Sequence, residues 1–187
     1  MTGREAPVVE TARLRLRPYK AGDLEVQARI LADPEVTRHL GGTPLSREEA
    51  WRRLLCGPSL WALLGYGYWA VERREDNVMI GFVGFADFKR DMSPSIEGRP
   101  EMGWIFAPAA QGQGYCTEAV KGGLGWADDV LSGEDVVAII NPENGPSIRV
   151  AERCGFSERQ EATYRNDPIL LFTRRPSQHR ETAAEAT

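Results

Sequence analysis

The spacing of hydrophobic residues along the chain changes between two periods, which predicts a mixture of strands and helices. Residues 13–17 (RLRLR) alternate polar and apolar side chains, the pattern of a half-buried strand. Residues 21–32 carry apolar side chains at i, i+4 and i+7, as on one face of a helix that should end before Pro34. Further strands are expected near residues 66–73, 78–87, 100–106, 135–140, 157–163 and 168–174, with helices near 114–129 and 144–154.

Several polar residues stand where helices should begin or end. Ser46 followed by Glu49 forms a capping box that begins a helix, and Gly57-Pro58 should break or kink it. Asn144 is a suitable N-cap for the later helix, and Gly155 fits the left-handed position after its end. The order of elements predicts one α/β (α+β) domain over residues 11–174, with flexible termini at 1–10 and 176–187 and a loop at 88–99.

Composition excludes several classes of protein. The 187 residues are 42% hydrophobic and 27% charged, as in an ordinary globular domain, and no apolar run approaches the ~20 residues of a membrane span. The net charge is −4 with no basic block longer than two residues, which argues against nucleic acid as a partner. The start lacks an apolar signal segment, so a cytoplasmic location is expected.

Cysteine and histidine are too sparse for a disulfide framework, a catalytic zinc site or a metal centre. Cys56, Cys116 and Cys154 are widely spaced and odd in number, which favours free thiols in a reducing compartment. The chain has two histidines, His39 and His179, and no HExxH motif. A hydrolase triad would depend on His39 alone, so that chemistry is not expected.

A glycine-rich turn separates the strand at 100–106 from the helix near 114–129. Gly112 and Gly114 allow backbone N–H groups to converge there, and the helix dipole adds positive charge behind them. Such a turn binds a diphosphate without a lysine. A Walker A loop would need Gly-Lys-Ser/Thr, but Tyr115-Cys116 follows Gly114. A dinucleotide fingerprint would need a third glycine where Thr117 stands, which leaves coenzyme A as the best fitting ligand.

The turn Gln111-Gly-Gln-Gly-Tyr-Cys116 resembles the diphosphate signature Gln/Arg-x-x-Gly-x-Gly/Ala of the GCN5-related N-acetyltransferase (GNAT) superfamily, from which Cys116 departs at the last position. Residues 141–147 (NPENGPS) and 153–156 (RCGF) are similar to its later signature. With the opening 11–17 (TARLRLR), they resemble the branch that includes ribosomal-protein N-terminal acetyltransferases.

The resemblance implies a mixed, mostly antiparallel sheet of six to seven strands with about four helices and a splayed central strand pair. In relatives the pantetheine arm of acetyl-CoA lies in that gap, and a primary amine attacks the thioester directly. Carried onto this sequence, the residues that contact acetyl-CoA are Trp104, Ile105, Phe106, Gln111, Gly112, Gln113, Gly114, Tyr115, Cys116, Thr117, Asn144 and Ser147. No metal is implied.

The resemblance leaves the acid and the base open. Glu101 is a candidate base acting through a water, and is equally well explained as a strand carboxylate. The tyrosine that commonly protonates the leaving thiolate is replaced by Ala151, so Ser147 is a candidate acid, or else a capping residue. An α-amine costs about 1 kcal/mol to neutralise at pH 7 and a lysine amine about 4.6, which favours an α-amine.

The acceptor amine is not defined by the sequence. His39 and Trp69 lie where relatives bind the acceptor and are candidate substrate contacts with Glu101, although such aromatics are more often core residues. Peptide termini and small amines both remain open, as does a homodimer. The alternative function is a CoA-binding sensor or interaction module without catalysis, and a dinucleotide-dependent oxidoreductase is a more distant one.

Overall fold

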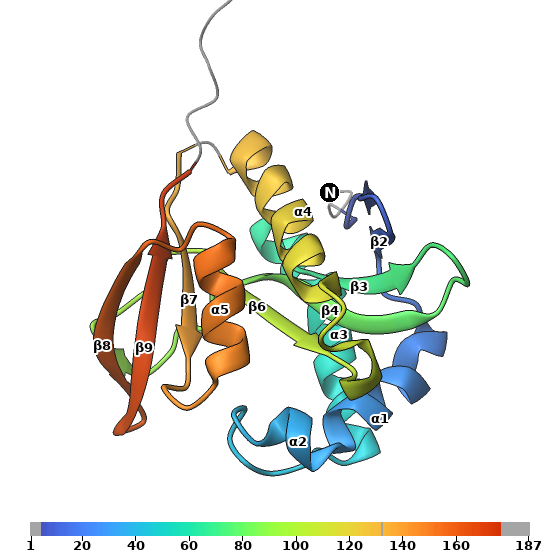
Figure 1. Cartoon of the computed structure of the whole chain (residues 1–187), viewed down its shortest axis with the longest axis horizontal. Coiled ribbons are helices and arrows are strands. Elements are labelled where there is room, and N and C mark those ends of the chain that lie inside the picture. Colours follow the sequence, from blue (N-terminus) through green and yellow to red (C-terminus); the bar gives the residue numbers. More distant parts are fainter. Residues whose placement is uncertain (1–4, 132, 177–187) are drawn as a thin grey trace, which may run out of the picture.

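A computed structural model describes residues 5–131 and 133–176 (Figure 1). This part of the chain forms nine strands and five α-helices. In chain order the elements are β1 (Val9–Glu10), β2 (Leu14–Arg17), η1 (Ala21–Asp23), α1 (Leu24–Ala32), α2 (Pro34–Thr37), α3 (Arg47–Leu64), β3 (Tyr68–Arg73), β4 (Met79–Ala86), β5 (Met92–Ser93), β6 (Glu101–Phe106), η2 (Pro108–Ala110), α4 (Tyr115–Val130), β7 (Val136–Ile140), α5 (Gly145–Arg153), β8 (Glu158–Tyr164) and β9 (Asp167–Arg174).

All nine strands belong to one sheet in the order β1-β2-β3-β4-β6-β7-β9-β8-β5. Neighbouring strands are antiparallel, except that β6 runs parallel to β7. The expected mixed, mostly antiparallel sheet is confirmed, but its count of six to seven strands is wrong. The two extra strands, β1 and β5, are two residues long, too short for a hydrophobic period to show in the sequence.

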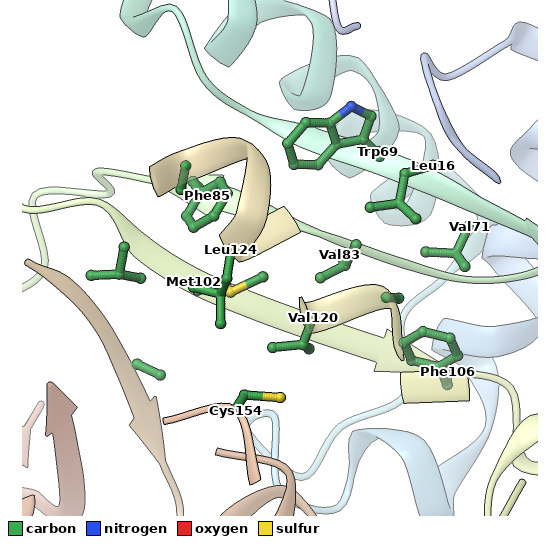
Figure 2. Packing of buried hydrophobic residues seen from close by; sticks show 14 of the residues in the cluster. Leu16, Trp69, Val71, Val83, Phe85, Met102, Phe106, Val120, Leu124 and Cys154 are labelled. Atoms are coloured by element: carbon green, nitrogen blue, oxygen red, sulfur yellow. The ribbon is translucent and has the colours of Figure 1, made fainter. Parts of the chain in front are cut away.

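Helices cover both faces of the sheet. Alternate residues of β6 point to opposite faces, so Met102 and Phe106 lie under α4, as Figure 2 shows with Val120 and Leu124. On the other face, Ile105 packs in a second cluster with Phe82 of β4, and α1 and α3 supply its remaining cover. The sheet therefore separates two packed layers, one on each of its faces.

Trp69 is a core residue, which corrects its assignment as a substrate contact. Its side chain is 0% exposed and packs edge-on against Trp61 and Trp126, with ring centroids 4.8 and 5.2 Å away. Its Nε1–H donates to the carbonyl oxygen of Pro7 at 2.7 Å. The strand period places Trp69 on the face covered by α4, so it has no route to a ligand.

The expected flexible start at 1–10 is wrong for its last two residues, which form a strand of the sheet. Ala6 is buried, and Val9 and Glu10 pair with β2. Residues 1–4 and 177–187 lie outside the described residues, and so does most of the expected C-terminal tail from 176.

Helix α3 continues through Pro58, where a break or kink was expected. It runs from Arg47 to Leu64 and ends at Gly65, which adopts φ +77°. Proline removes a single intrahelical hydrogen bond, and the burial of Leu54 and Trp61 on either side compensates for that loss. The capping box at its start is confirmed, since the side chains of Ser46 and Glu49 each accept from the other's backbone N–H.

In the part of the chain that the structure describes, none of the helices has the length and apolar character needed to cross a bilayer.

Glu118 of α4 connects the helix to the opening strands. Its Oε1 accepts from the Thr11 hydroxyl at 2.6 Å and from the Arg13 backbone N–H at 2.7 Å. Its Oε2 accepts from Nε of Arg13 at 2.7 Å. Burial acts against the charged form, but these hydrogen bonds and the charge of Arg13 outweigh it and lower the pKa of Glu118 below its ordinary value. One carboxylate thus holds the start of α4 against β2.

Replacing Glu118 with alanine should destabilise the fold in a pH-dependent way. The free energy of unfolding, measured with urea at pH 7, should fall by about 1–3 kcal/mol because three donors lose their acceptor. A lowered folded-state pKa stabilises above the unfolded pKa of about 4.3, and that stabilisation disappears as the pH falls through the folded value. The difference between the two proteins should therefore shrink below about pH 4.

The control is Glu25→Ala, which removes an exposed ion pair with Arg47. That change should cost at most about 1 kcal/mol. Equal losses in the two variants would contradict the role assigned to Glu118.

Candidate functional site

Strands β6 and β7 separate soon after they meet. Their single paired position is Glu101 opposite Val137, where the N–H of Val137 donates to Pro100 at 3.0 Å. Beyond this point β6 pairs with β4 along its outer edge, and β7 pairs with β9. The facing edges of Trp104–Phe106 and Ala138–Ile140 therefore have backbone groups without a strand partner, and Figure 1 shows the two strands running apart. An extended ligand can pair with such an edge.

The glycine-rich turn lies where β6 gives way to α4. Gly112 and Gly114 adopt φ +74° and +79°, the left-handed region that favours glycine. Gly114 is the N-cap of α4, so the first N–H groups of the helix have no intrahelical partner. A Cβ on Gly112 would meet nothing within 4 Å, so the turn is open to solvent at that point. The geometry is that of an anion cradle.

Side chains brace this turn from within. Gln113 Nε2 donates to the carbonyl of Ala109 at 2.8 Å, and Gln111 Nε2 lies 3.5 Å from the carbonyl of Phe106 at the end of β6. Arg13 donates to the carbonyl of Gln113 at 3.1 Å, and its guanidinium lies 4.4 Å from the ring centroid of Tyr115. The predicted ligand residues 111–116 therefore form one turn that side-chain hydrogen bonds hold in place. The backbone N–H groups at the start of α4 remain available to a ligand.

Helix α5 faces the turn across the gap. Asn144 Oδ1 accepts from the N–H of Ser147 at 3.2 Å, which confirms Asn144 as the N-cap. The hydroxyl of Ser147 accepts from Nε1 of Trp104 at 3.4 Å. Capping is therefore performed by Asn144, and the hydroxyl of Ser147 is directed toward β6. Trp104 and Ser147, both predicted as ligand contacts from the family resemblance, are therefore in contact with each other.

A family model for an acetyltransferase (GNAT) domain matches residues 13–157. The chain belongs to the GNAT acetyltransferase family. It is 28% identical over 149 residues to the uncharacterized N-acetyltransferase p20 of Bacillus licheniformis, covering 79% of this chain and 81% of that one. A GnaT-family acetyltransferase from Bordetella pertussis has a TM-score of 0.78 at 28% identity, with 90% and 99% of the two chains covered. The chain is therefore an acetyl-CoA-dependent N-acetyltransferase.

Two more distant structures share the GNAT fold. A spermidine N-acetyltransferase from Vibrio cholerae, in complex with CoA and spermine, has a TM-score of 0.69 at 18% identity, covering 89% of this chain and 97% of that one. A ribosomal L7/L12 α-N-protein acetyltransferase in complex with CoA has a TM-score of 0.69 at 16% identity, covering 90% and 98%. At these sequence identities, the similarity shows a shared fold only.

The residues of this GNAT domain fit acetyl-CoA as a cosubstrate. The left-handed glycines leave the cradle free of side chains for a diphosphate, and the unpaired edge of β6 is long enough for an extended arm. The described residues contain no group of three or more His, Cys, Asp or Glu side chains placed to hold a metal.

The thiols of this GNAT domain near the cradle are structural. Burial raises the pKa of Cys116 well above its ordinary value, and the neighbouring Cys154 adds to the shift. The thiol of Cys154 donates to the carbonyl of Thr117 at 3.7 Å, and burial raises its pKa to about 11. Both thiols are therefore protonated at neutral pH and are poor nucleophiles.

Glu101 is paired with Arg90, a partner that the sequence did not indicate. Arg90 donates to both carboxylate oxygens, at 2.5 and 2.7 Å, and the Glu101 side chain is 5% exposed. Arg90 is in turn stacked between Phe88 and Tyr164, at 5.1 and 5.0 Å from their ring centroids. Each oxygen of Glu101 thus accepts one hydrogen bond from Arg90, and the carboxylate is almost completely buried.

The candidate acceptor residues are separated in space. His39 lies in the turn after α2 and does not line the cavity of about 550 Å³ that opens on the sheet face opposite α4. That cavity includes Tyr68, Arg53 and Arg90, none of which is among the predicted substrate contacts His39, Trp69 and Glu101. They come from α3, β3 and the loop after β4, and no local pattern could have brought them together.

A valine at Gly114 should abolish cofactor binding without unfolding the protein. A β-branched side chain at φ +79° must shift the backbone of the cradle, so CoA affinity measured by titration calorimetry should fall at least about 100-fold, the equivalent of two or more amide contacts.

The matched control is Gly133→Val, at a glycine with φ +88° in the turn after α4. It carries the same backbone strain, so it should lower the melting temperature to a similar degree while CoA affinity is retained. Unchanged affinity in Gly114→Val would place the diphosphate elsewhere.

Proposed function

We propose that this GNAT domain transfers the acetyl group of acetyl-CoA to a primary α-amine by direct attack of the amine in a ternary complex. The observation that supports it best is the separation of β6 from β7 beside the glycine-rich start of α4. The residues that would hold acetyl-CoA are the amides of the turn at 111–117, the edge of β6 at Trp104–Phe106, and Asn144 and Ser147 of the α5 start.

The pairing of Glu101 favours an acceptor that needs little help from a base. A lysine amine with a pKa of about 10.4 costs about 4.6 kcal/mol to neutralise at pH 7, and an α-amine near 7.8 costs about 1. Glu101 remains our candidate base, acting through a water beside the Arg90 guanidinium. Its role in the resting protein is to position Arg90, since both oxygens are engaged.

We assign proton delivery to the leaving thiolate to Ser147. Ala151, which stands where relatives commonly have a tyrosine, is 0% exposed and carries no proton donor. The hydroxyl of Ser147 accepts from Trp104, which leaves its own proton available for donation toward the gap.

The acceptor class is tested by turnover with two amines. A short peptide with a free α-amine and Nα-acetyl-lysine amide are incubated with acetyl-CoA at pH 7, and released CoA thiol is measured. We expect the peptide to give the higher kcat/KM because its amine is largely neutral at this pH. Faster turnover of the lysine compound would contradict an α-amine acceptor, and CoA binding without thiol release for any amine would favour the sensor.

Ser147→Ala should lower kcat by about 10- to 100-fold, the range of a lost proton donor, in addition to any rise in the KM for acetyl-CoA from the lost contact. Ser147→Thr, which keeps a hydroxyl, should restore part of the rate. The control is Ser59→Ala on α3, where the hydroxyl donates to the carbonyl of Leu55 within the helix. A rise in the KM for acetyl-CoA with unchanged kcat would show that Ser147 binds the cosubstrate only.

A further inference from the structure

The cavity opposite α4 is lined by residues that contact the strand on which the acetyl group is expected to lie. Tyr68 and Phe82 line it, and Phe82 is paired with Ile105 of β6. The hydroxyl of Tyr68 lies against Gly103, where an added Cβ would be 2.3 Å from the oxygen. The cavity therefore lies beside β6, with Tyr68 and Phe82 between the two, on the sheet face that the CoA cradle does not use.

The lining of this cavity is strongly cationic. Arg52, Lys89 and Arg90 each have a carboxylate partner, but no salt bridge within the described residues involves Arg53 or Arg165. The single acidic side chain in the lining is Asp91. Two guanidinium groups thus face the cavity without a counter-charge from the part of the chain that the structure describes.

The inner wall adds hydrogen-bond donors to this charge. Burial, with a smaller contribution from the charge of Glu101, raises the pKa of Tyr68 to about 12, so its phenol stays protonated and can donate. Arg53 is close enough to Tyr19 and Tyr68 to act on both phenols electrostatically. Phe88 and Tyr164, which hold Arg90 between them, form the apolar part of the wall.

We propose that the acceptor is a primary amine that also carries an oxyanion, a carboxylate or a phosphate, which Arg53 and Arg165 bind in this cavity while the amine points toward β6. The inference rests on the proposed function and specifies its substrate class. A guanidinium binds a carboxylate or a phosphate through paired N–H donors. The lining therefore favours a negatively charged group but does not distinguish a carboxylate from a phosphate.

The same charges reject polycations. Spermine, bound by one of the structural neighbours, carries only positive groups and would face the arginines of this cavity. Like charges placed together in a site cost binding energy, so polyamines and aminoglycosides are expected to be poor substrates here. The shared GNAT fold therefore does not carry a shared acceptor.

The test compares three dipeptide amides that have the same α-amine: Ser-Glu-amide, its neutral isostere Ser-Gln-amide, and Ser-phosphoserine-amide. Thiol release from acetyl-CoA should give a kcat/KM at least tenfold higher for an anionic dipeptide than for the neutral one. The glutamyl and phosphoseryl arms identify whether the carboxylate or the phosphate is preferred. Spermidine should be acetylated more slowly than any of the three.

Arg53→Gln should lower kcat/KM for the anionic dipeptides by about 10- to 100-fold, as expected for a lost charged hydrogen bond. It should change kcat/KM for the neutral dipeptide by less than about threefold. The KM for acetyl-CoA should be unchanged. Arg29→Gln, an exposed arginine of α1 outside the cavity lining, is the matched control and should behave as wild type.

Equal rates for Ser-Glu-amide and Ser-Gln-amide, or equal losses for both in Arg53→Gln, would overturn the proposal while leaving acetyl transfer intact. If no amine is acetylated, the proposed function fails instead. The charge preference is then decided by thermal shift with the dipeptides alone, where stabilisation by the anionic forms in wild type and not in Arg53→Gln supports it and its absence refutes it.

Discussion

The separation of β6 from β7 is the constraint on which the rest of the site depends. A parallel pair normally continues for the length of its shorter strand, but here it ends after Glu101 and Val137. Each strand has a full antiparallel partner on its other side, so the sheet stays intact while the inner edges remain open. The gap therefore costs the sheet few hydrogen bonds, and a ligand that pairs with the open edge can recover them.

The two packed layers give the two sides of that gap different chemistry. On the α4 side, charge recognition comes from backbone amides at the left-handed glycines, and the nearby Arg13 is neutralised by Glu118. On the α3 side, recognition comes from side chains, and Arg53 has no such partner among the described residues. The cradle and the cationic cavity are thus separate binding surfaces on opposite faces of the sheet.

Local signals in the sequence predicted most of the fold and the cradle, because each depends on residues a few positions apart. Ser46 with Glu49, Asn144 with Ser147, and Gly155 at φ +86° all formed as expected. The acceptor side could not be predicted in this way. Arg90 reaches Glu101 across an irregular loop, and the order of the strands alone brings Tyr68 onto Gly103. The overall charge of −4 also concealed a cationic cavity, because net charge does not describe its distribution.

The ion pair between Arg90 and Glu101 connects the cationic cavity, which Arg90 lines, to the first residue of β6. Arg90 donates to both oxygens of this carboxylate, and Glu101 in turn holds the stacked guanidinium in the lining of the cavity. An enzyme arranged in this way relies less on proton abstraction and more on positioning an amine that is already largely neutral. With Ala151 in place of a tyrosine, the acid side is equally reduced, to a serine hydroxyl. These groups are what we expect for our proposed acceptor, an easily deprotonated α-amine that also carries an anionic group.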